Sequence, residues 1–137
     1  MAVILDSDAV IGFLDRRDAL HDAADAAIRE LVREAPLTVS AVTYAEVLTG
    51  VKLGHHPEKP AKGFFADLVS DVHSVDMVVA DKAAELRAAS KALRMPDALI
   101  LATAETDPEV DLLVTGDAGL TKVSGFNCAV RLLQHPG

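Results

Sequence analysis

The sequence predicts an α/β domain built around a largely parallel sheet. Two continuous apolar runs, Ala2–Leu5 and residues 112–114, have the length of strands and lack the alternation of a half-exposed sheet, which is typical of strands buried on both faces. Between such runs lie stretches with apolar residues three and four positions apart, most clearly over residues 20–34. Because strands and helices alternate along the chain, parallel strands covered by helices are expected.

Polar residues and prolines divide the first half of the chain into elements. The expected elements are a strand over residues 2–5, a short helix over 10–14, a helix over 20–34, a strand over 37–39, and a helix that follows residue 40 and ends at Gly50 or Gly54. Asp6 ends the first strand, and Pro36 stops the second helix because proline cannot continue it. Ser40 is a suitable N-cap for the helix that follows.

The second half of the chain continues the alternation. The expected elements are a polar loop over residues 55–62, a strand over 72–75, helices over 79–93 and 97–105, and strands over 112–114 and 129–133. Pro57 and Pro60 indicate the loop, and Pro96 separates the two helices. No internal repeat or linker interrupts the chain, so residues 1–137 are expected to form one domain.

Composition limits the class of protein. The chain has 137 residues, half of them apolar, and can therefore bury a core without disulfides. Cys128 is the only cysteine and cannot form an internal disulfide, which favours a reducing compartment, and we expect the cytoplasm. The N-terminus lacks the basic start and long apolar run of a signal peptide, and no apolar stretch is long enough to span a membrane, so no membrane association is expected.

The net charge bears on nucleic-acid binding. A formal charge of −8 argues against broad, nonspecific binding of phosphate backbones, which depends on clustered Lys and Arg. An acidic protein can still act on nucleic acid if its carboxylates hold cations, because the bound metal then supplies positive charge at the phosphate. Arg87, Lys91 and Arg94 lie near one helical face that leads to Asp97 and could steer a phosphate, although a solvated face is the plainer interpretation.

Four acidic residues stand at positions that a parallel sheet could bring together. Asp6 and Asp117 each follow a predicted buried strand, and ligand sites in open α/β sheets form beyond the C-terminal ends of strands. Asp97 follows Pro96 at the start of an apolar helix, and Glu46 lies early in a separate helix. Grouped carboxylates repel one another, and Mg²⁺ or Mn²⁺ relieves that repulsion. Such a metal activates water for hydrolysis of a phosphodiester.

Each acid also has a purely structural interpretation when it is taken singly. Asp6 and Asp117 could be turn or cap residues, because Asp beside Gly is ordinary turn chemistry. Asp97 could be an acid favoured by the helix dipole, and Glu46 a solvated helix residue. The four together, in order, point to one site.

The acids lie within motifs that resemble those of a known family, the PIN-domain nucleases. The similar stretches are residues 3–7 (VILDS), 40–50 (SAVTYAEVLTG), 96–104 (PDALILATA) and 113–117 (LVTGD). Their order and spacing extend over nearly the whole chain, and the second and third are the most specific. Asp8 departs from the family pattern, where a small neutral polar residue is more frequent; it could add a ligand or cap the helix that follows.

The resemblance implies a fold, an activity and partners. The fold is a PIN-like three-layer α/β fold with a mostly parallel central sheet flanked by helices. The activity is that of a Mg²⁺- or Mn²⁺-dependent endoribonuclease, with metal ligands and catalytic residues at Asp6, Glu46, Asp97 and Asp117 and a polar neighbour at Thr115. For a chain this short, the resemblance implies a VapC-type toxin that cleaves RNA, is inhibited by a VapB-type antitoxin and is usually a homodimer.

Two other functions compete with this interpretation. The stretch Asp6-Ser7-Asp8 after an apolar strand also resembles the start of haloacid-dehalogenase-type phosphatases, in which Asp6 would be the nucleophile. Against this, the chain is short for that family, and no lysine stands in a convincing motif between the two acids. A non-catalytic PIN-like module would bind RNA or a protein without cleavage. The sequence leaves open the RNA target, the number of metal ions and the identity of the antitoxin.

Overall fold

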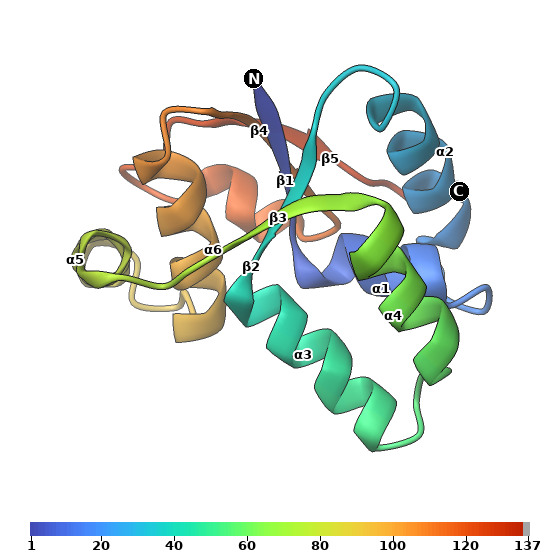
Figure 1. The fold of residues 1–137 in the computed structure, drawn as a ribbon. Coiled ribbons are helices and arrows are strands. Elements are labelled where there is room, and N and C mark those ends of the chain that lie inside the picture. The colour runs from blue at the N-terminus through green and yellow to red at the C-terminus, as the bar shows by residue number, and fades with distance from the viewer. Residues whose placement is uncertain (136–137) are drawn as a thin grey trace.

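The computed structural model describes residues 1–135, which form one sheet with helices around it (Figure 1). The strands are β1 (Ala2–Leu5), β2 (Leu37–Ser40), β3 (Val69–His73), β4 (Val110–Thr115) and β5 (Ala129–Leu132). The helices are α1 (Ser7–Leu14), α2 (His21–Leu31), α3 (Ala41–Lys52), α4 (Glu58–Asp67), α5 (Met77–Ala89), α6 (Met95–Thr106) and the 3₁₀ helix η1 (Ala118–Lys122).

The five strands are parallel and stand in the order β3-β2-β1-β4-β5. β1 therefore lies in the middle of the sheet, where Leu5 pairs with Val39 of β2 and with Val114 of β4. This arrangement confirms the predicted parallel α/β fold. It also brings the C-terminal ends of β1, β2 and β4 to the same edge of the sheet, so the residues that follow these strands become neighbours.

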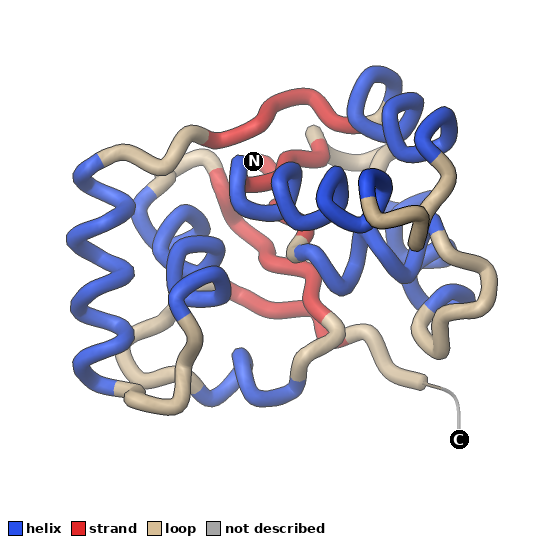
Figure 2. Tube along the Cα trace, turned by 90° about the horizontal axis from the view of Figure 1, so that it is seen from below, coloured by secondary structure: helices blue, strands red, loops and turns tan. Residues whose placement is uncertain are grey.

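Helices cover both faces of the sheet, which makes three layers (Figure 2). Val3 and Leu5 of β1 pack with α1, α2 and α4 on one face, whereas Ile4 packs with α5 and α6 on the other. Side chains of one strand alternate between the two faces, and here both faces are apolar because both are covered. The continuous apolar run of β1 follows from this double burial.

Several helices begin where the sequence places a capping side chain. Ser40 accepts a hydrogen bond from the Val42 amide at 3.0 Å and so confirms the predicted N-cap of α3. Asp6, rather than Asp8, caps α1. At the far end of α3, Gly54 has φ of +80°, a conformation that favours glycine, so the second of the two predicted ends is the correct one.

The predicted polar loop over residues 55–62 was wrong in its second part, because α4 begins at Glu58. Pro57 is the N-cap of α4, and Pro60 lies in its first turn. Amides in the first turn of a helix have no carbonyl partner within it, so a proline there costs no hydrogen bond. The apolar residues Ala61 and Phe64 then anchor the helix in the core.

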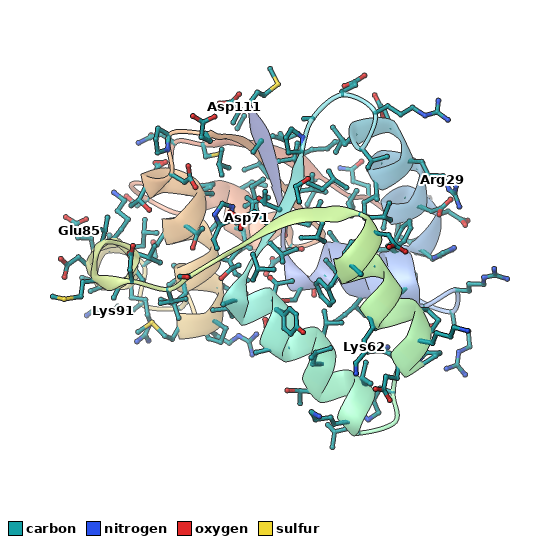
Figure 3. All side chains as sticks on the ribbon, viewed as in Figure 1. Arg29, Lys62, Asp71, Glu85, Lys91 and Asp111 are labelled. Atoms are coloured by element: carbon teal, nitrogen blue, oxygen red, sulfur yellow. The ribbon has the colours of Figure 1, made fainter. Side chains whose placement is uncertain are left out.

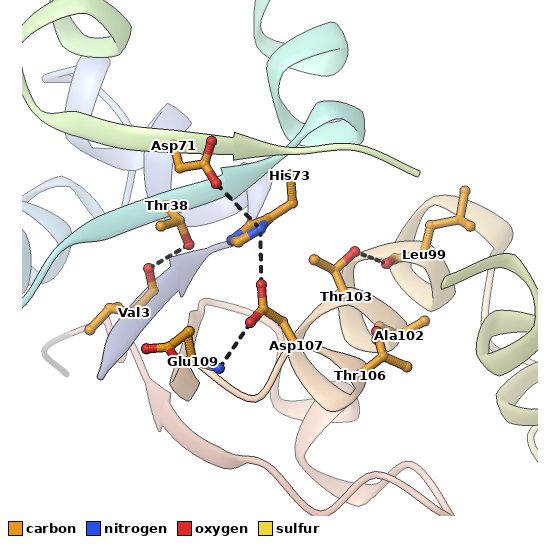
Figure 4. Close-up of polar contacts among 10 residues, drawn as sticks. All are labelled: Val3, Thr38, Asp71, His73, Leu99, Ala102, Thr103, Thr106, Asp107 and Glu109. Carbon is orange, nitrogen blue, oxygen red and sulfur yellow. Dashed lines mark hydrogen bonds and ion pairs between the residues drawn. The ribbon is translucent and has the colours of Figure 1, made fainter. Parts of the chain in front are cut away.

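The edge strand β3 and the helix α5 both start earlier than predicted. The strand covers Val69–His73 instead of residues 72–75, and α5 covers Met77–Ala89 instead of 79–93. His73 connects β3 to the end of α6, since its Nδ1 lies 3.3 Å from Oδ2 of Asp107, the C-cap of that helix (Figure 4). The same nitrogen lies 3.9 Å from Oδ2 of Asp71 in β3. Such tertiary contacts are not visible in the local sequence pattern.

Charged side chains lie mainly on the outside of the molecule. Arg29, Glu85 and Asp111 project from its periphery (Figure 3). Within residues 1–135, none of the helices combines the length and the apolar character needed to cross a membrane. Several acids near the C-terminal ends of β1 and β4 are different, because they face one another around a single cavity.

Candidate active site

Asp6 is the most buried acid of the site. It follows β1 directly, and only 4% of its surface is exposed. Its Oδ1 accepts a hydrogen bond from the Ala9 amide at 2.9 Å, and its Oδ2 accepts one from the Thr115 hydroxyl. The pKa of Asp6 is raised to about 7. Burial is the main cause, Asp8 and Asp97 add to the rise, and the two hydrogen bonds oppose it. This carboxyl group therefore exchanges its proton near neutral pH.

Thr115 and Asp117 shape the end of the neighbouring strand, β4. The Thr115 hydroxyl is fully buried and accepts a hydrogen bond from the Asp117 amide at 3.0 Å. Asp117 caps η1, since its Oδ1 accepts a hydrogen bond from the Gly119 amide at 2.8 Å. Its side chain is nevertheless exposed to solvent. Asp117 thus has the cap role that its position beside glycine indicated, and it also faces the other acids.

Glu46 is held by a residue outside the predicted set of site residues. The Ser7 hydroxyl, in the first turn of α1, donates a hydrogen bond to Oε1 of Glu46 at 2.6 Å. Its oxygen also lies 3.3 Å from the hydroxyl oxygen of Thr43, one turn before Glu46 in α3. Ser7 follows Asp6 in the first motif, and this adjacency was the available signal. The contact joins the start of α1 to α3.

Asp97 lies in the first turn of α6, where Pro96 occupies one of the first two positions. Oδ2 of Asp97 lies 3.6 Å from Nε of Arg94, the N-cap residue of the same helix. Burial raises the pKa of Asp97, Arg94 opposes this rise, and Asp117 and Glu46 add to it. Of the three cations considered in the sequence, only Arg94 reaches the acids. Arg87 instead donates to the Leu93 carbonyl at 2.8 Å.

The acids surround one cavity of about 240 Å³ at the C-terminal edge of the sheet. The lining residues are Asp6, Ser7, Asp8, Glu46, Arg94, Asp97 and Asp117. All four predicted acids are thus brought together, and Asp8 joins them. Five carboxylates face a single guanidinium group, and burial with its acidic neighbours raises the pKa of Asp8 as well. The cavity is therefore strongly electronegative and favours a cation.

The donor set of the cavity suits a hard divalent cation. Its lining offers carboxylate and hydroxyl oxygens, which are the ligands of Mg²⁺ and Mn²⁺, and no thiol or imidazole. Among residues 1–135, no three acidic, histidine or cysteine side chains are close enough to enclose an ion directly. The four predicted acids instead each contact a donor of the protein. Such spacing fits Mg²⁺, which keeps several of its waters and takes few protein ligands.

The geometry does not suit Asp6 as a nucleophile. A phosphatase of the haloacid-dehalogenase type needs a carboxylate oxygen free to attack phosphorus. Both oxygens of Asp6 accept hydrogen bonds, and the side chain is buried. The only basic residue that lines the cavity is Arg94. Metal-assisted hydrolysis by water is more consistent with these contacts than a covalent intermediate.

Comparisons with known proteins show the family to which the chain belongs. The sequence matches the PIN-domain family over residues 3–125. None of the curated protein sequences matches the chain at a significant level.

Solved structures of VapC-type toxins and related complexes share the fold. A chain of the VapBC2 complex from Rickettsia felis, bound to a promoter DNA fragment, matches with a TM-score of 0.78 and 16% identity over 98% of this chain and 100% of that chain. A toxin–antitoxin complex from Klebsiella pneumoniae matches with a TM-score of 0.69 and 25% identity over 98% and 99%. VapC20 of Mycobacterium tuberculosis, a sarcin–ricin loop cleaving toxin, matches with 0.69 and 16% over 91% and 96%.

Proposed function

The chain belongs to the PIN-domain family, and on that premise we propose that residues 1–137 form one metal-dependent endoribonuclease domain, the toxin of a VapBC-type pair. The observation that carries the proposal is the single cavity in which Asp6, Glu46, Asp97 and Asp117 meet. These acids come from four separate parts of the chain, and their convergence on one cavity indicates that they act together. An acidic cavity of this kind is unfavourable for folding and is typical of a site that binds cations.

The four acids are the proposed ligands of one or two Mg²⁺ or Mn²⁺ ions, and Asp8 is placed to assist them. A metal bound there supplies an activated water and neutralises charge on the phosphoryl group. The chain's own residues orient the ligands. The Ala9 amide and the Thr115 hydroxyl hold Asp6, and the Ser7 hydroxyl holds Glu46. Such supporting hydrogen bonds fix the direction of the carboxylates before the substrate arrives.

RNA is the proposed substrate, and an antitoxin is the proposed inhibitor. The support is the likeness in fold to VapBC complexes and to VapC20, whose described target is the sarcin–ricin loop. A reducing compartment suits the single thiol of Cys128, so we place the activity in the cytoplasm.

A homodimer is proposed on the family resemblance of the sequence motifs and on an apolar surface. Val75, just before α5, and Met77 and Val78, at its start, have 41%, 81% and 62% of their surface exposed. Neighbouring apolar side chains left in water favour association with another protein surface. Light scattering of the purified chain tests this, and a monomer at every concentration would contradict it.

The experiment that tests the activity compares four samples of cellular RNA on a gel. The purified chain is incubated with Mg²⁺ or Mn²⁺, with EDTA, as the Asp97→Asn variant and as the Asp111→Asn variant. Asp111 is exposed on β4 and does not line the cavity, so it is the matched control. We expect discrete cleavage that is lost with EDTA and in Asp97→Asn but kept in Asp111→Asn.

Two results would contradict the proposal in different ways. Intact RNA in every sample, when an added control ribonuclease does cleave it, would exclude the nuclease activity. If the chain still bound Mn²⁺ in that case, the non-catalytic binding module would be the better interpretation. Cleavage that survives EDTA and Asp97→Asn would place the activity elsewhere or in a contaminant.

A further inference from the structure

A second cavity adjoins the acidic one and shares part of its wall. It has a volume of about 230 Å³ and lies between the turn that joins α5 to α6 and the helix η1. Arg94, Asp97 and Asp117 line both cavities, so the two lie side by side. The remaining lining residues are Ser90, Ala92, Leu93, Gly119, Leu120, Lys122 and Val123.

The lining of this side cavity differs from that of the acidic one. Leu93 and Leu120 are buried and, with Val123, form an apolar wall. Lys122 is exposed beside them, so the side cavity has two cations where the acidic cavity has one. Its carboxylates are the two that it shares with the acidic cavity. An apolar wall with a few polar groups at its margin is the usual composition of a small-ligand site.

We infer that the side cavity binds the nucleotide next to the cleaved phosphodiester bond, with the base against the apolar wall and a phosphate near Arg94. This inference rests on the proposed ribonuclease function. The two nucleotides that flank a bond are covalently linked to it, so each must occupy space beside the cleavage site, and the side cavity is such a space. Ligand pockets for whole drug-sized molecules are larger, and a cavity of this size suits one base.

Arg94 lines both cavities, and most of its side chain is exposed to solvent. Its side chain is 74% exposed, and its Nε lies 3.6 Å from Asp97, which is longer than a direct hydrogen bond. A guanidinium group binds phosphate oxygens with two parallel hydrogen bonds. In a chain of net charge −8, Arg94 and Lys122 together give the side cavity the cations that an RNA backbone needs.

The base would be recognised by contact with its face and by donors at its edge. Every base has an apolar face, and single-stranded RNA is typically bound through such faces with added hydrogen bonds to base edges. The Ser90 hydroxyl and the Lys122 ammonium are the side-chain donors of the cavity besides Arg94. Donors read acceptor atoms, so we expect the cavity to prefer some bases over others.

Binding of single nucleotides tests the inference without cleavage. The isotope-labelled chain with Mg²⁺ is titrated with each of the four ribonucleoside 5′-monophosphates and with ribose 5-phosphate, and amide shifts are followed by NMR. We expect the nucleotides, and not ribose 5-phosphate, to shift Ala92, Gly119 and Lys122, by amounts that depend on the base. Equal shifts with ribose 5-phosphate, or shifts that omit these residues, would overturn the inference.

Filling the side cavity tests the same point in the cleavage reaction. Ala92 is exposed and lines the cavity, so Ala92→Phe narrows it, whereas Ala88→Phe adds the same ring to an exposed position of α5 outside the cavity. RNA with randomised bases is cleaved and the products are sequenced. We expect Ala92→Phe to lower the rate by about tenfold or more and to weaken the base preference beside the cut, with Mn²⁺ affinity unchanged.

The outcomes separate this inference from the proposed function. RNA cleavage by the wild type with no base preference, and at the same rate in Ala92→Phe, would overturn the inference and leave the nuclease intact. No RNA cleavage by the wild type would overturn the nuclease, and the nucleotide titration would still report on the cavity. Thermal unfolding of both Phe variants controls for misfolding, and equal rate losses in Ala88→Phe and Ala92→Phe would also count against the inference.

Discussion

The Thr115 hydroxyl, at the end of β4, donates a hydrogen bond to Oδ2 of Asp6, at the end of β1, across 109 positions of sequence. Both side chains are buried, and the same hydroxyl oxygen accepts the Asp117 amide. The Thr115 hydroxyl therefore connects Asp6, the most buried acid of the site, to the backbone of Asp117, a second acid of the site. Because this bond lowers the pKa of Asp6 against the effect of burial, its loss should be measurable.

Replacing Thr115 with valine keeps the shape of the side chain and removes the donor. We expect the pKa of Asp6 to rise further above about 7, so the acid limb of the pH–rate profile for RNA cleavage should move to higher pH. Oδ2 of Asp6 would lose its donor in the buried site, which should lower the free energy of unfolding by about 1–3 kcal/mol. Thr121→Val, at an exposed position of η1, is the control. An unshifted profile would show that the Thr115 hydroxyl does not tune Asp6.

Ser7→Ala removes the hydroxyl that holds Glu46. The carboxylate would lose its 2.6 Å partner but keep its charge, so we expect kcat to fall by about tenfold with a smaller change in KM. Ser7→Thr retains a hydroxyl group and should restore most of the rate. Glu46→Gln should lose more than Ser7→Ala, because it removes the proposed ligand itself. Equal rates in wild type and Ser7→Ala would remove Ser7 from the site.

Divalent metal should stabilise the protein through the acidic cavity. At a concentration one hundred times its Kd, an ion that binds only the folded chain raises the free energy of unfolding by about 2.7 kcal/mol. We expect Mg²⁺ or Mn²⁺ to raise the melting temperature of wild type and of Asp111→Asn, and to have little effect on Asp97→Asn. Equal stabilisation of Asp97→Asn would mean that the metal binds outside this cavity.

The stability of the metal-free protein should fall as pH rises through the range set by Asp6. Its pKa is about 7 in the folded chain and 3.8 as the ordinary value, so between these values the folded state keeps a proton that the unfolded state releases. We expect the free energy of unfolding in EDTA to fall from pH 5 to pH 8 by about 2–3 kcal/mol more in wild type than in Asp6→Asn.

Urea denaturation at a series of pH values measures this difference. Asp6→Asn is the informative comparison because other titrating groups are common to both proteins. Parallel pH dependences in the two proteins would mean that Asp6 has its ordinary pKa of 3.8 in the folded state. Added Mg²⁺ should reduce the loss of stability at pH 8, since a bound cation favours the charged carboxylate.

Much of the fold was accessible from local patterns. The apolar runs of β1 and β4, the cap at Ser40 and the break at Pro96 each reflect a rule that acts within a few residues. The helix α4 was missed because two prolines resemble a loop signal although the first turn of a helix tolerates them. The edge strand β3 was misplaced because it is largely exposed and carries no continuous apolar run.

The amino-acid sequence by itself determined the order of the strands and of the helices other than α4 and η1, and the places of the four acids on these elements, because these features depend on local periodicity, capping and chain breaks. Only the tertiary structure decided that Ser7 holds Glu46, that Thr115 holds Asp6, and that Arg94 stands between two cavities. These contacts join residues 39 and 109 positions apart, or depend on the turn between α5 and α6. Parallel pairing of β1 with its two neighbours creates them, because it places the ends of separate strands at one edge of the sheet.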